Sequence, residues 1–153
     1  MINQLPLHFG QTIKSAVRTQ FAALCYRIKE NKVQILMVTT RRSGRWIIPK
    51  GWPVNGMEPQ NSAAREAWEE AGVIGRPEMR PLGLFSYSKF LSKKKSLSCV
   101  AVVYAVKVNS LAETFPEQGQ RERKWVSSKK AASMVVEPDL AQILLDYNPL
   151  LVD

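Results

Sequence analysis

Blocks of apolar residues separated by short polar stretches divide the chain into predicted strands and helices. Residues 18–28 and 33–39 (VQILMVT) are apolar runs joined by the polar segment 30–32, a pattern typical of a hairpin. A third short strand is predicted at 46–48, where Pro49 stops it because proline cannot donate to a sheet ladder. The first third of the chain is therefore expected to be β-structure.

The remaining pattern predicts one helix, more strands and closing helices. The central helix is expected from Asn61 to Ala71, with Asn61 or Ser62 as its cap and Gly72 just past its end. The later elements are strands at 82–91, 98–108 and 123–126, a short helix capped by Ser128, and a helix from Pro138 to Tyr147. This order predicts a mixed α/β fold with helices flanking the sheet.

Length and composition favour one domain that buries a core. The chain has 153 residues, of which 45% are hydrophobic. Residues 1–16 lack a clear period and are interpreted as an N-terminal arm, and 17–153 as the domain. The start of the sequence shows no secretory signal, and the apolar runs are too short to span a bilayer. Cys25 and Cys99 each lie in an apolar run, as expected for reduced cysteines in the core. A cytoplasmic protein without a membrane partner is expected, and its oligomeric state stays open.

The charge balance favours anionic partners. Lys and Arg total 22 against 13 Asp and Glu, a net charge of +9, which suits phosphorylated metabolites, nucleic acid or an acidic membrane. No motif combines aromatic and basic residues as in RNA recognition, so nucleic acid is possible but not favoured.

Acidic residues gather on the predicted central helix of this basic chain. Glu66, Glu69 and Glu70 follow the spacing i, i+3 and i+4, which places all three on one face. Like charges at this spacing destabilise a helix. One interpretation is a solvated acidic face, on which Arg65 pairs with Glu69. The other is a divalent-cation site, because hard cations take carboxylate oxygens as ligands.

The segment that leads into this helix resembles the Nudix box. The conserved glycines and the Arg-Glu and Glu-Glu pairs of the box match this chain at the correct spacing. One position differs, because Met57 replaces the first glutamate of the box and Glu58 follows it. The matching residues are Gly51, Arg65, Glu66, Glu69, Glu70 and Gly72. The resemblance covers about residues 17–147 and implies a Nudix-type α/β/α sandwich with a mixed sheet.

The resemblance also implies chemistry, namely hydrolysis of a phosphoanhydride bond with Mg²⁺ or Mn²⁺. Glu66, Glu70 and the Gly51 carbonyl would be metal ligands. Glu69 would be either a further ligand or the base that activates water, and Arg65 would hold a carboxylate in place. The implied catalytic residues are thus Glu69, Glu66 and Arg65. Loss of the acid at Met57 leaves two outcomes, an active enzyme or a silent Nudix-like module that binds RNA or a phosphorylated ligand.

Residues around the box look most like the diphosphoinositol-polyphosphate phosphohydrolase branch. The similar segments are 45–49, 70–73 and 121–125. Nucleoside diphosphates linked to another group, dinucleoside polyphosphates and diphosphoinositol polyphosphates are therefore the expected substrates. The candidate substrate-binding residues are Arg18, Arg41, Arg42, Lys50, Trp52 and Arg123. Against this branch, Glu137 stands where a basic residue is expected, and an acid there would repel a highly phosphorylated ring.

Overall fold

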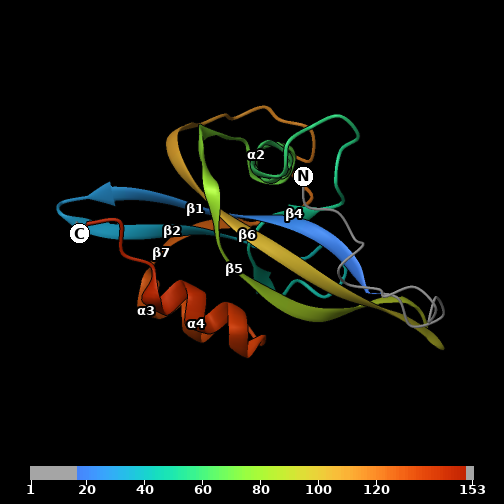
Figure 1. The fold of residues 1–153 in the computed structure, drawn as a ribbon. Coiled ribbons are helices and arrows are strands. Elements are labelled where there is room, and N and C mark those ends of the chain that lie inside the picture. Colours follow the sequence, from blue (N-terminus) through green and yellow to red (C-terminus); the bar gives the residue numbers. More distant parts are fainter. Residues whose placement is uncertain (1–16, 151–153) are drawn as a thin grey trace.

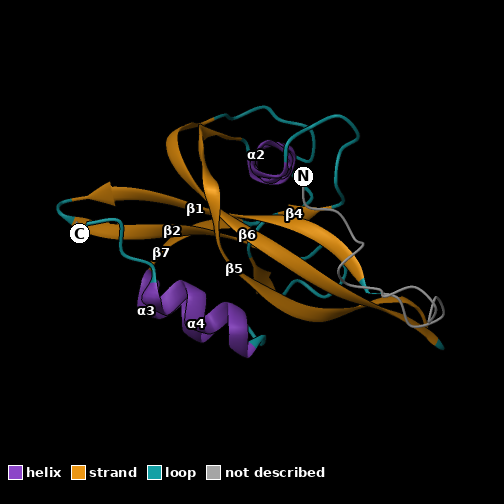
Figure 2. Cartoon of the chain, viewed as in Figure 1, coloured by secondary structure: helices purple, strands orange, loops and turns teal. Residues whose placement is uncertain are grey.

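The computed structural model describes residues 17–150. A twisted sheet separates α2 on one face from α3 and α4 on the other, as Figures 1 and 2 show. The elements are β1 (Arg18–Lys29), β2 (Lys32–Thr39), β3 (Trp46–Ile47), β4 (Lys50–Gly51), α2 (Pro59–Ala71), β5 (Val73–Ser92), β6 (Lys95–Leu111), β7 (Arg123–Ser127), α3 (Ser128–Met134) and α4 (Pro138–Asp146). The α/β/α sandwich with a mixed sheet predicted from the sequence is confirmed.

The sheet is mixed because β1 runs parallel to β6, whereas its other pairings are antiparallel. The strands follow the order β3-β2-β1-β6-β5, with β4 paired to β1 and β7 paired to β2. The predicted β1–β2 hairpin is present, with Tyr26 opposite Ile35. Helices lie on both sides of the sheet, and every residue of β1 from Thr19 to Tyr26 is buried, so no alternation of buried and exposed positions remains.

The β5–β6 hairpin is longer than the sequence pattern indicates. We expected strands at 82–91 and 98–108, whereas β5 begins at Val73 and β6 ends at Leu111. The missing part of β5 contains Pro77 and Pro81, and the register with β6 shifts between them. Such irregularities break the two-residue period on which a strand prediction depends. The distal part of this hairpin projects beyond the two helical layers (Figure 1).

Helix α2 begins two residues before the predicted start. Its first residue is Pro59, which suits the first helical turn because its missing N–H has no partner there. The Ser62 hydroxyl does not cap the helix but accepts a hydrogen bond from the Val54 N–H at 3.1 Å. Gly72 ends the helix as predicted, with φ of 70°, and its N–H bonds to the Trp68 carbonyl. The chain thereby fixes both ends of the helix that carries the glutamates.

The closing helices pack on the opposite face of the sheet. The α3 cap is Ser127 rather than the predicted Ser128, and its hydroxyl accepts from the Lys130 N–H at 3.1 Å. Leu140 and Leu144 of α4 are fully buried, as expected for the apolar stripe of an amphipathic helix. Within residues 17–150, no helix has the length and apolar composition needed to cross a bilayer.

Candidate active site

A cavity of about 260 Å³ lies where β1, β4 and α2 meet, close to the start of the α2 glutamate face. Its wall combines three carboxylates, four basic side chains and one exposed aromatic ring. The lining residues of these kinds are Glu66, Glu70, Glu117, Arg41, Lys50, Lys89, Arg121 and Trp52, together with Gly51 and Gln20. Acidic and basic groups thus share one hollow, which suits a substrate whose negative charge needs both a cation and basic residues.

The acidic side of the cavity depends on close contact between α2 and β4. Glu66 and Glu70 lie one helical turn apart and both line the cavity, as the i, i+4 spacing predicted. Gly51 in β4 faces Glu66 so closely that a Cβ atom at position 51 would overlap the Glu66 carboxylate. The glycine is therefore required by space, not by its backbone angles. The Gly51 backbone and two carboxylates come together as predicted for the box.

Burial and crowding change the acidity of this pair. Burial, with the neighbouring Glu69 carboxylate adding to it, raises the pKa of Glu66 to about 7. Burial also raises the pKa of Glu70 to about 8, although Arg121 opposes the shift and Glu66 adds to it. A bound cation would favour the ionised form of both groups, because its positive charge would add to that of Arg121 and Lys50, which already act on Glu70.

Two residues of the 112–122 loop complete the acidic side, and the sequence pattern did not identify their role. The Arg121 guanidinium lies 3.6 Å from a Glu70 carboxylate oxygen and donates to Glu117 at 3.0 Å. The Glu117 N–H donates to the Glu69 carbonyl at 2.9 Å, which ties the loop to α2. Neither residue lies in a periodic segment. Arg121 begins the segment 121–125 noted for its resemblance, and the only signal for Glu117 was its charge.

The donor set fits a divalent cation such as Mg²⁺ or Mn²⁺. Oxygen ligands are available from Glu66, Glu70, Glu117 and the Gly51 backbone, and Mg²⁺ keeps several waters, so few protein ligands suffice. Within the described residues, no three Asp, Glu, Cys or His side chains already converge closely enough to hold an ion. Glu66 and Glu70 lie one helical turn apart, and the Glu117 side chain would have to move toward them to add a third carboxylate.

Glu69 and Arg65 lie outside the residues that line the cavity. Their side chains pair with each other at 3.2 Å, as predicted for the i, i+4 positions, and the Arg65 side chain is half exposed. The carboxylate that Arg65 holds is thus that of Glu69, through one hydrogen bond rather than two. The roles of Glu69 as ligand or base remain predictions, and Glu117 is a competing candidate for both.

The rest of the cavity wall is basic and aromatic. Lys50 places its ammonium 4.5 Å from the centre of the Tyr87 ring, and burial lowers its pKa from the usual value. Lys89 lies 5.9 Å from the centre of the Trp52 ring. Arg41 donates to Gln120 at 3.1 Å at the cavity edge. Three of the predicted substrate-binding residues, Arg41, Lys50 and Trp52, therefore do line one cavity.

The other three predicted substrate-binding residues do not line it. Arg18 and Arg42 are exposed on the surface. The Arg123 guanidinium is committed elsewhere, because it donates to the Ala71 carbonyl at 2.5 Å and the Ala112 carbonyl at 3.1 Å. The Ala71 carbonyl at the end of α2 has no partner within the helix, and Arg123 supplies one. The geometry therefore gives Arg123 a structural role in place of the predicted contact with substrate.

The two departures from the family pattern also lie away from the carboxylates. Met57 and Glu58 line a separate hollow beside Tyr104, so neither faces the Glu66–Glu70 pair. Glu137 is buried, and its carboxylate accepts two hydrogen bonds from Arg45, at 2.6 and 3.3 Å. The expected repulsion of a phosphorylated ring is therefore not supported, because Arg45 neutralises this acid inside the fold.

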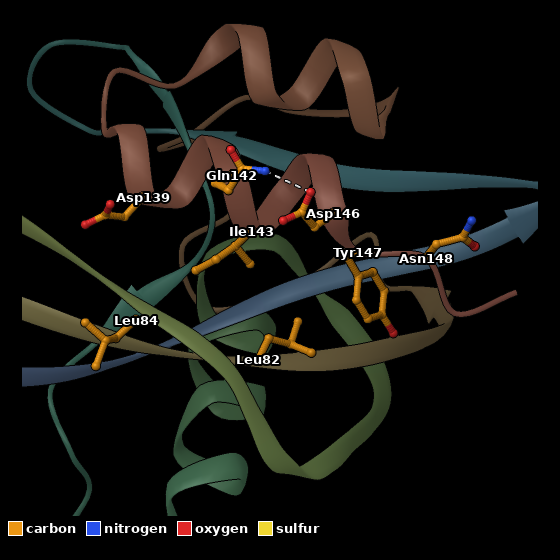
Figure 3. Close-up of a pocket in the computed structure, with 8 residues that line it drawn as sticks. All are labelled: Leu82, Leu84, Asp139, Gln142, Ile143, Asp146, Tyr147 and Asn148. Carbon is orange, nitrogen blue, oxygen red and sulfur yellow. Dashed lines mark hydrogen bonds between the residues drawn. The ribbon is translucent and has the colours of Figure 1, made fainter. Parts of the chain in front are cut away.

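A hollow of about 400 Å³ between β5 and α4 has a different character (Figure 3). Its wall contains Leu82, Ile143 and two carboxylates, Asp139 and Asp146, and the Gln142 amide donates to Asp146 at 2.8 Å. Among the described residues that line it, there is no lysine or arginine. This hollow does not suit a polyphosphate, so the smaller, charged cavity is the candidate site.

Comparison with known proteins agrees with this fold. Residues 18–147 match the family model described as NUDIX domain. The chain is 34% identical over 113 residues to Nudix hydrolase 13, mitochondrial, of Arabidopsis thaliana, covering 69% of this chain and 54% of that protein. It is 30% identical over 116 residues to diphosphoinositol polyphosphate phosphohydrolase 3-beta of Homo sapiens, covering 74% and 66%. The chain therefore spans only about half the length of the Arabidopsis relative.

Solved structures show the same fold at lower identity. A C. elegans Ap4A hydrolase binary complex aligns with a TM-score of 0.61 at 18% identity, covering 84% of this chain and 93% of that one. The NUDIX domain of Shewanella oneidensis NrtR complexed with ADP ribose aligns with a TM-score of 0.62 at 15% identity, covering 94% and 95%. At these identities the likeness extends to the fold alone.

Proposed function

The chain belongs to the NUDIX family, and from this premise we propose that it hydrolyses a phosphoanhydride bond with Mg²⁺ or Mn²⁺. The proposed substrate is a small phosphorylated molecule, namely a nucleoside diphosphate linked to another group, a dinucleoside polyphosphate or a diphosphoinositol polyphosphate. The observation that carries the proposal is the cavity that Glu66, Glu70 and Gly51 share with Lys50 and Arg41.

The acidic side would hold the cation. Glu66, Glu70 and the Gly51 carbonyl are the proposed ligands, with Glu69 or Glu117 as a further one. A bound ion would neutralise phosphate charge and polarise the phosphoryl oxygen. Arg121 already donates to Glu117 and lies beside Glu70, so it limits how far these carboxylates move.

The basic side would hold the diphosphate. Lys50, Arg41 and Lys89 line the same cavity as the glutamates and can donate to phosphate oxygens there. Holding the substrate between fixed donors aligns the bond to be cleaved with an attacking water, which is most of what phosphoryl transfer requires from a protein. The net charge of +9 adds a field that attracts such substrates.

A carboxylate must accept the proton of the attacking water. We propose Glu117, because it lines the cavity and Glu69 does not. Glu69 is the alternative implied by the box. The two assignments predict different variants to be inactive.

A hydrolysis assay tests the proposal. Purified protein is assayed for phosphate or nucleotide release from diadenosine tetraphosphate, ADP-ribose and a diphosphoinositol polyphosphate, with and without Mg²⁺ or Mn²⁺. We expect metal-dependent release from at least one substrate and a loss of about 100-fold or more in Glu70→Gln, since that variant removes a metal ligand. Glu113→Gln is the matched control, because Glu113 is exposed and outside the cavity.

Two results would overturn the proposal. Equal activity in Glu70→Gln and the wild type would remove the metal assignment. No hydrolysis of any of the three substrates, together with tight binding of one of them or of a short RNA, would favour the silent binding module instead.

A further inference from the structure

We infer that the hollow between β5 and α4 binds the tip of the β5–β6 hairpin of a second copy of this chain. This acidic hollow is the one that Asp139 and Asp146 line, and the hairpin tip is residues 91–95. The dimer has two-fold symmetry, so that the tip of each copy lies in the acidic hollow of the other. The inference concerns a surface outside the candidate active site and does not depend on the proposed hydrolysis.

The hairpin tip is basic and carries an exposed apolar residue. Residues 79–112 contain no Asp or Glu, although the chain has 13 acidic residues. Lys93, Lys94 and Lys95 lie at the tip and are all exposed. The adjoining Leu91 is 52% exposed. Because the tip projects beyond the two helical layers (Figure 1), another protein surface can reach it. Such a tip suits a partner surface that is both apolar and acidic.

The acidic hollow has this combination of properties. Leu82 and Leu84 of β5 and Ile143 of α4 form its apolar part (Figure 3). The Leu84 side chain is 54% exposed. Asp139 and Asp146 are seven residues apart on α4, so they lie on the same side of the helix, about 10 Å apart along its axis. The acidic hollow can therefore accept a leucine side chain and more than one lysine of the same segment.

The free edge of the sheet connects the acidic hollow to the hairpin tip. β5 is the last strand in the sheet order, so its outer side has no strand partner among residues 17–150. Pro77 and Pro81 lie in the first half of β5 and cannot donate to a ladder, whereas residues 83–92 contain no proline. An open edge of this kind presents unpaired N–H and C=O groups to another strand. The second half of β5 can therefore pair with the same segment of a second copy.

Pairing of these two edges brings the tip of one copy to the acidic hollow of the other. Identical edges that pair around a two-fold axis perpendicular to the sheet run antiparallel. The centre of the segment 83–92 lies between Tyr87 and Ser88, so the axis passes there. Leu91 of one copy then lies opposite the partner's Leu84. The lysines of the tip extend further along the partner's strand, beside the two carboxylates of its α4.

The net charge of +9 does not prevent this contact. At physiological ionic strength, exposed charges more than about 8 Å apart are largely screened from each other. The close contacts are between lysines and carboxylates, and the symmetry makes each of them occur twice. A basic segment of another protein would also suit the acidic hollow. The hairpin tip is favoured because it is basic and apolar and lies on the same strand that lines the acidic hollow.

Sedimentation of the full chain over a range of micromolar concentrations tests the inference. We expect a reversible equilibrium between monomer and dimer. The tip variant Lys93→Glu, Lys94→Glu and the hollow variant Asp139→Lys, Asp146→Lys should each raise the dissociation constant by at least about 10-fold. The reason is that each variant replaces attraction by contact between like charges.

The matched control for the tip variant is Lys29→Glu, Lys32→Glu. It makes the same change of charge at exposed residues of another hairpin turn, between β1 and β2. Its dissociation constant should stay within about 2-fold of the wild type, as for a typical surface substitution. The melting temperature of each variant shows that it is folded.

A mixture of the tip variant and the hollow variant gives the sharpest measurement. The tip variant has an acidic tip and an acidic hollow, whereas the hollow variant has a basic tip and a basic hollow. In a heterodimer, both contacts again join opposite charges. The mixture should therefore dimerise at least about 10-fold more tightly than either variant alone.

Four outcomes would overturn the inference. The first is a wild-type chain that stays monomeric throughout, and the second is a mixture that dimerises no better than its components. The third is loss of the dimer in the hollow variant alone, which would show that the acidic hollow binds another part of the second copy. The fourth is stronger association of the tip variant, which would mean that the lysines protect the edge of β5 against pairing. None of these results bears on the hydrolysis assay.

Discussion

The two sides of the cavity are built in different ways. The acidic side comes mainly from one helix, on which Glu66 and Glu70 are fixed by the i, i+4 spacing. The rest of the wall is assembled from β1, β4 and β5, which contribute Gln20, Lys50 and Lys89, and from the 112–122 loop, which contributes Glu117. The proposed ligands Glu66 and Glu70 thus lie on one rigid element, whereas the proposed base and the basic residues come from several. Substitutions on the two sides should accordingly affect different measured quantities.

The largest effect is expected for Glu117→Gln. If Glu117 accepts the proton of the attacking water, the variant loses about 10²- to 10⁴-fold in kcat while KM and metal affinity stay near wild type. Steady-state kinetics at several pH values measures this, and the acidic limb of the kcat profile should disappear. Glu69→Gln is the competing variant, and Glu113→Gln is the control. If Glu69→Gln alone loses kcat in this way, the base is Glu69 and our assignment is wrong.

Gly51→Ala should have the next largest effect, through geometry alone. The added methyl group would overlap the Glu66 carboxylate and displace it from the cavity. A shift of about 1 Å in a catalytic group costs roughly 100-fold in rate. Metal-dependent activity and Mn²⁺ affinity should fall together. Gly83→Ala is the control, because its added Cβ atom would meet only the flexible Ile143 side chain. Gly44→Ala is less suitable, because Gly44 has a positive φ that alanine rarely adopts. Equal activity in Gly51→Ala and Gly83→Ala would contradict the packing described.

The residues changed in these two variants also show which parts of the site can be predicted from the sequence. The α2 glutamates, Gly51 and Gly72 could be predicted because a helix period and a fixed motif spacing place them. Glu117 and Arg121 could not, because their loop has no period and reaches α2 only through tertiary hydrogen bonds, such as that from the Glu117 N–H to the Glu69 carbonyl. The pairing of β1 with β4, which places Gly51 opposite Phe21, is equally hard to predict from a linear sequence.

Elements with irregular pairing were likewise underestimated. The early part of β5 was not predicted, since Pro77 and Pro81 disrupt the alternation that marks a strand. Arg123 was predicted to bind substrate, because charge alone does not reveal that its guanidinium bonds to the Ala71 carbonyl. Sequence reasoning therefore predicted the acidic residues that line the cavity better than the basic ones.

The raised pKa values of Glu66 and Glu70 predict a moderate effect of pH on the stability of the fold. Both pKa values in the folded protein, about 7 for Glu66 and about 8 for Glu70, lie above the usual 4.5. A folded carboxyl that binds protons more tightly than the unfolded one loses its contribution as pH rises. Without metal, the free energy of unfolding should therefore fall between about pH 5 and 8.

Added metal should reverse this trend. Mg²⁺ or Mn²⁺ binds the ionised pair, so it should stabilise the protein more at pH 8 than at pH 5.5. Urea unfolding at the two pH values, with and without metal, measures the difference. The double variant Glu66→Gln, Glu70→Gln should show a smaller pH dependence and little stabilisation by metal. A metal effect that is the same in this variant would place the ion elsewhere.

Glu58→Gln should have the smallest effect. Glu58 follows the replaced position Met57, but both line the separate hollow beside Tyr104. Hydrolysis and Mn²⁺ affinity should change by less than about 2-fold, as for a typical surface substitution. A large loss in either would mean that Glu58 moves to the carboxylates of α2 and replaces the missing acid of the box.

The metal assignment is the central claim, and crystals soaked in Mn²⁺ test it most directly. Anomalous diffraction should show an ion between the carboxylates of Glu66 and Glu70, within coordination distance of the Gly51 carbonyl. Absence of the peak in Glu70→Gln crystals would strengthen the assignment. An ion bound only elsewhere, or none at saturating Mn²⁺ with Glu66 and Glu70 ionised, would contradict the account.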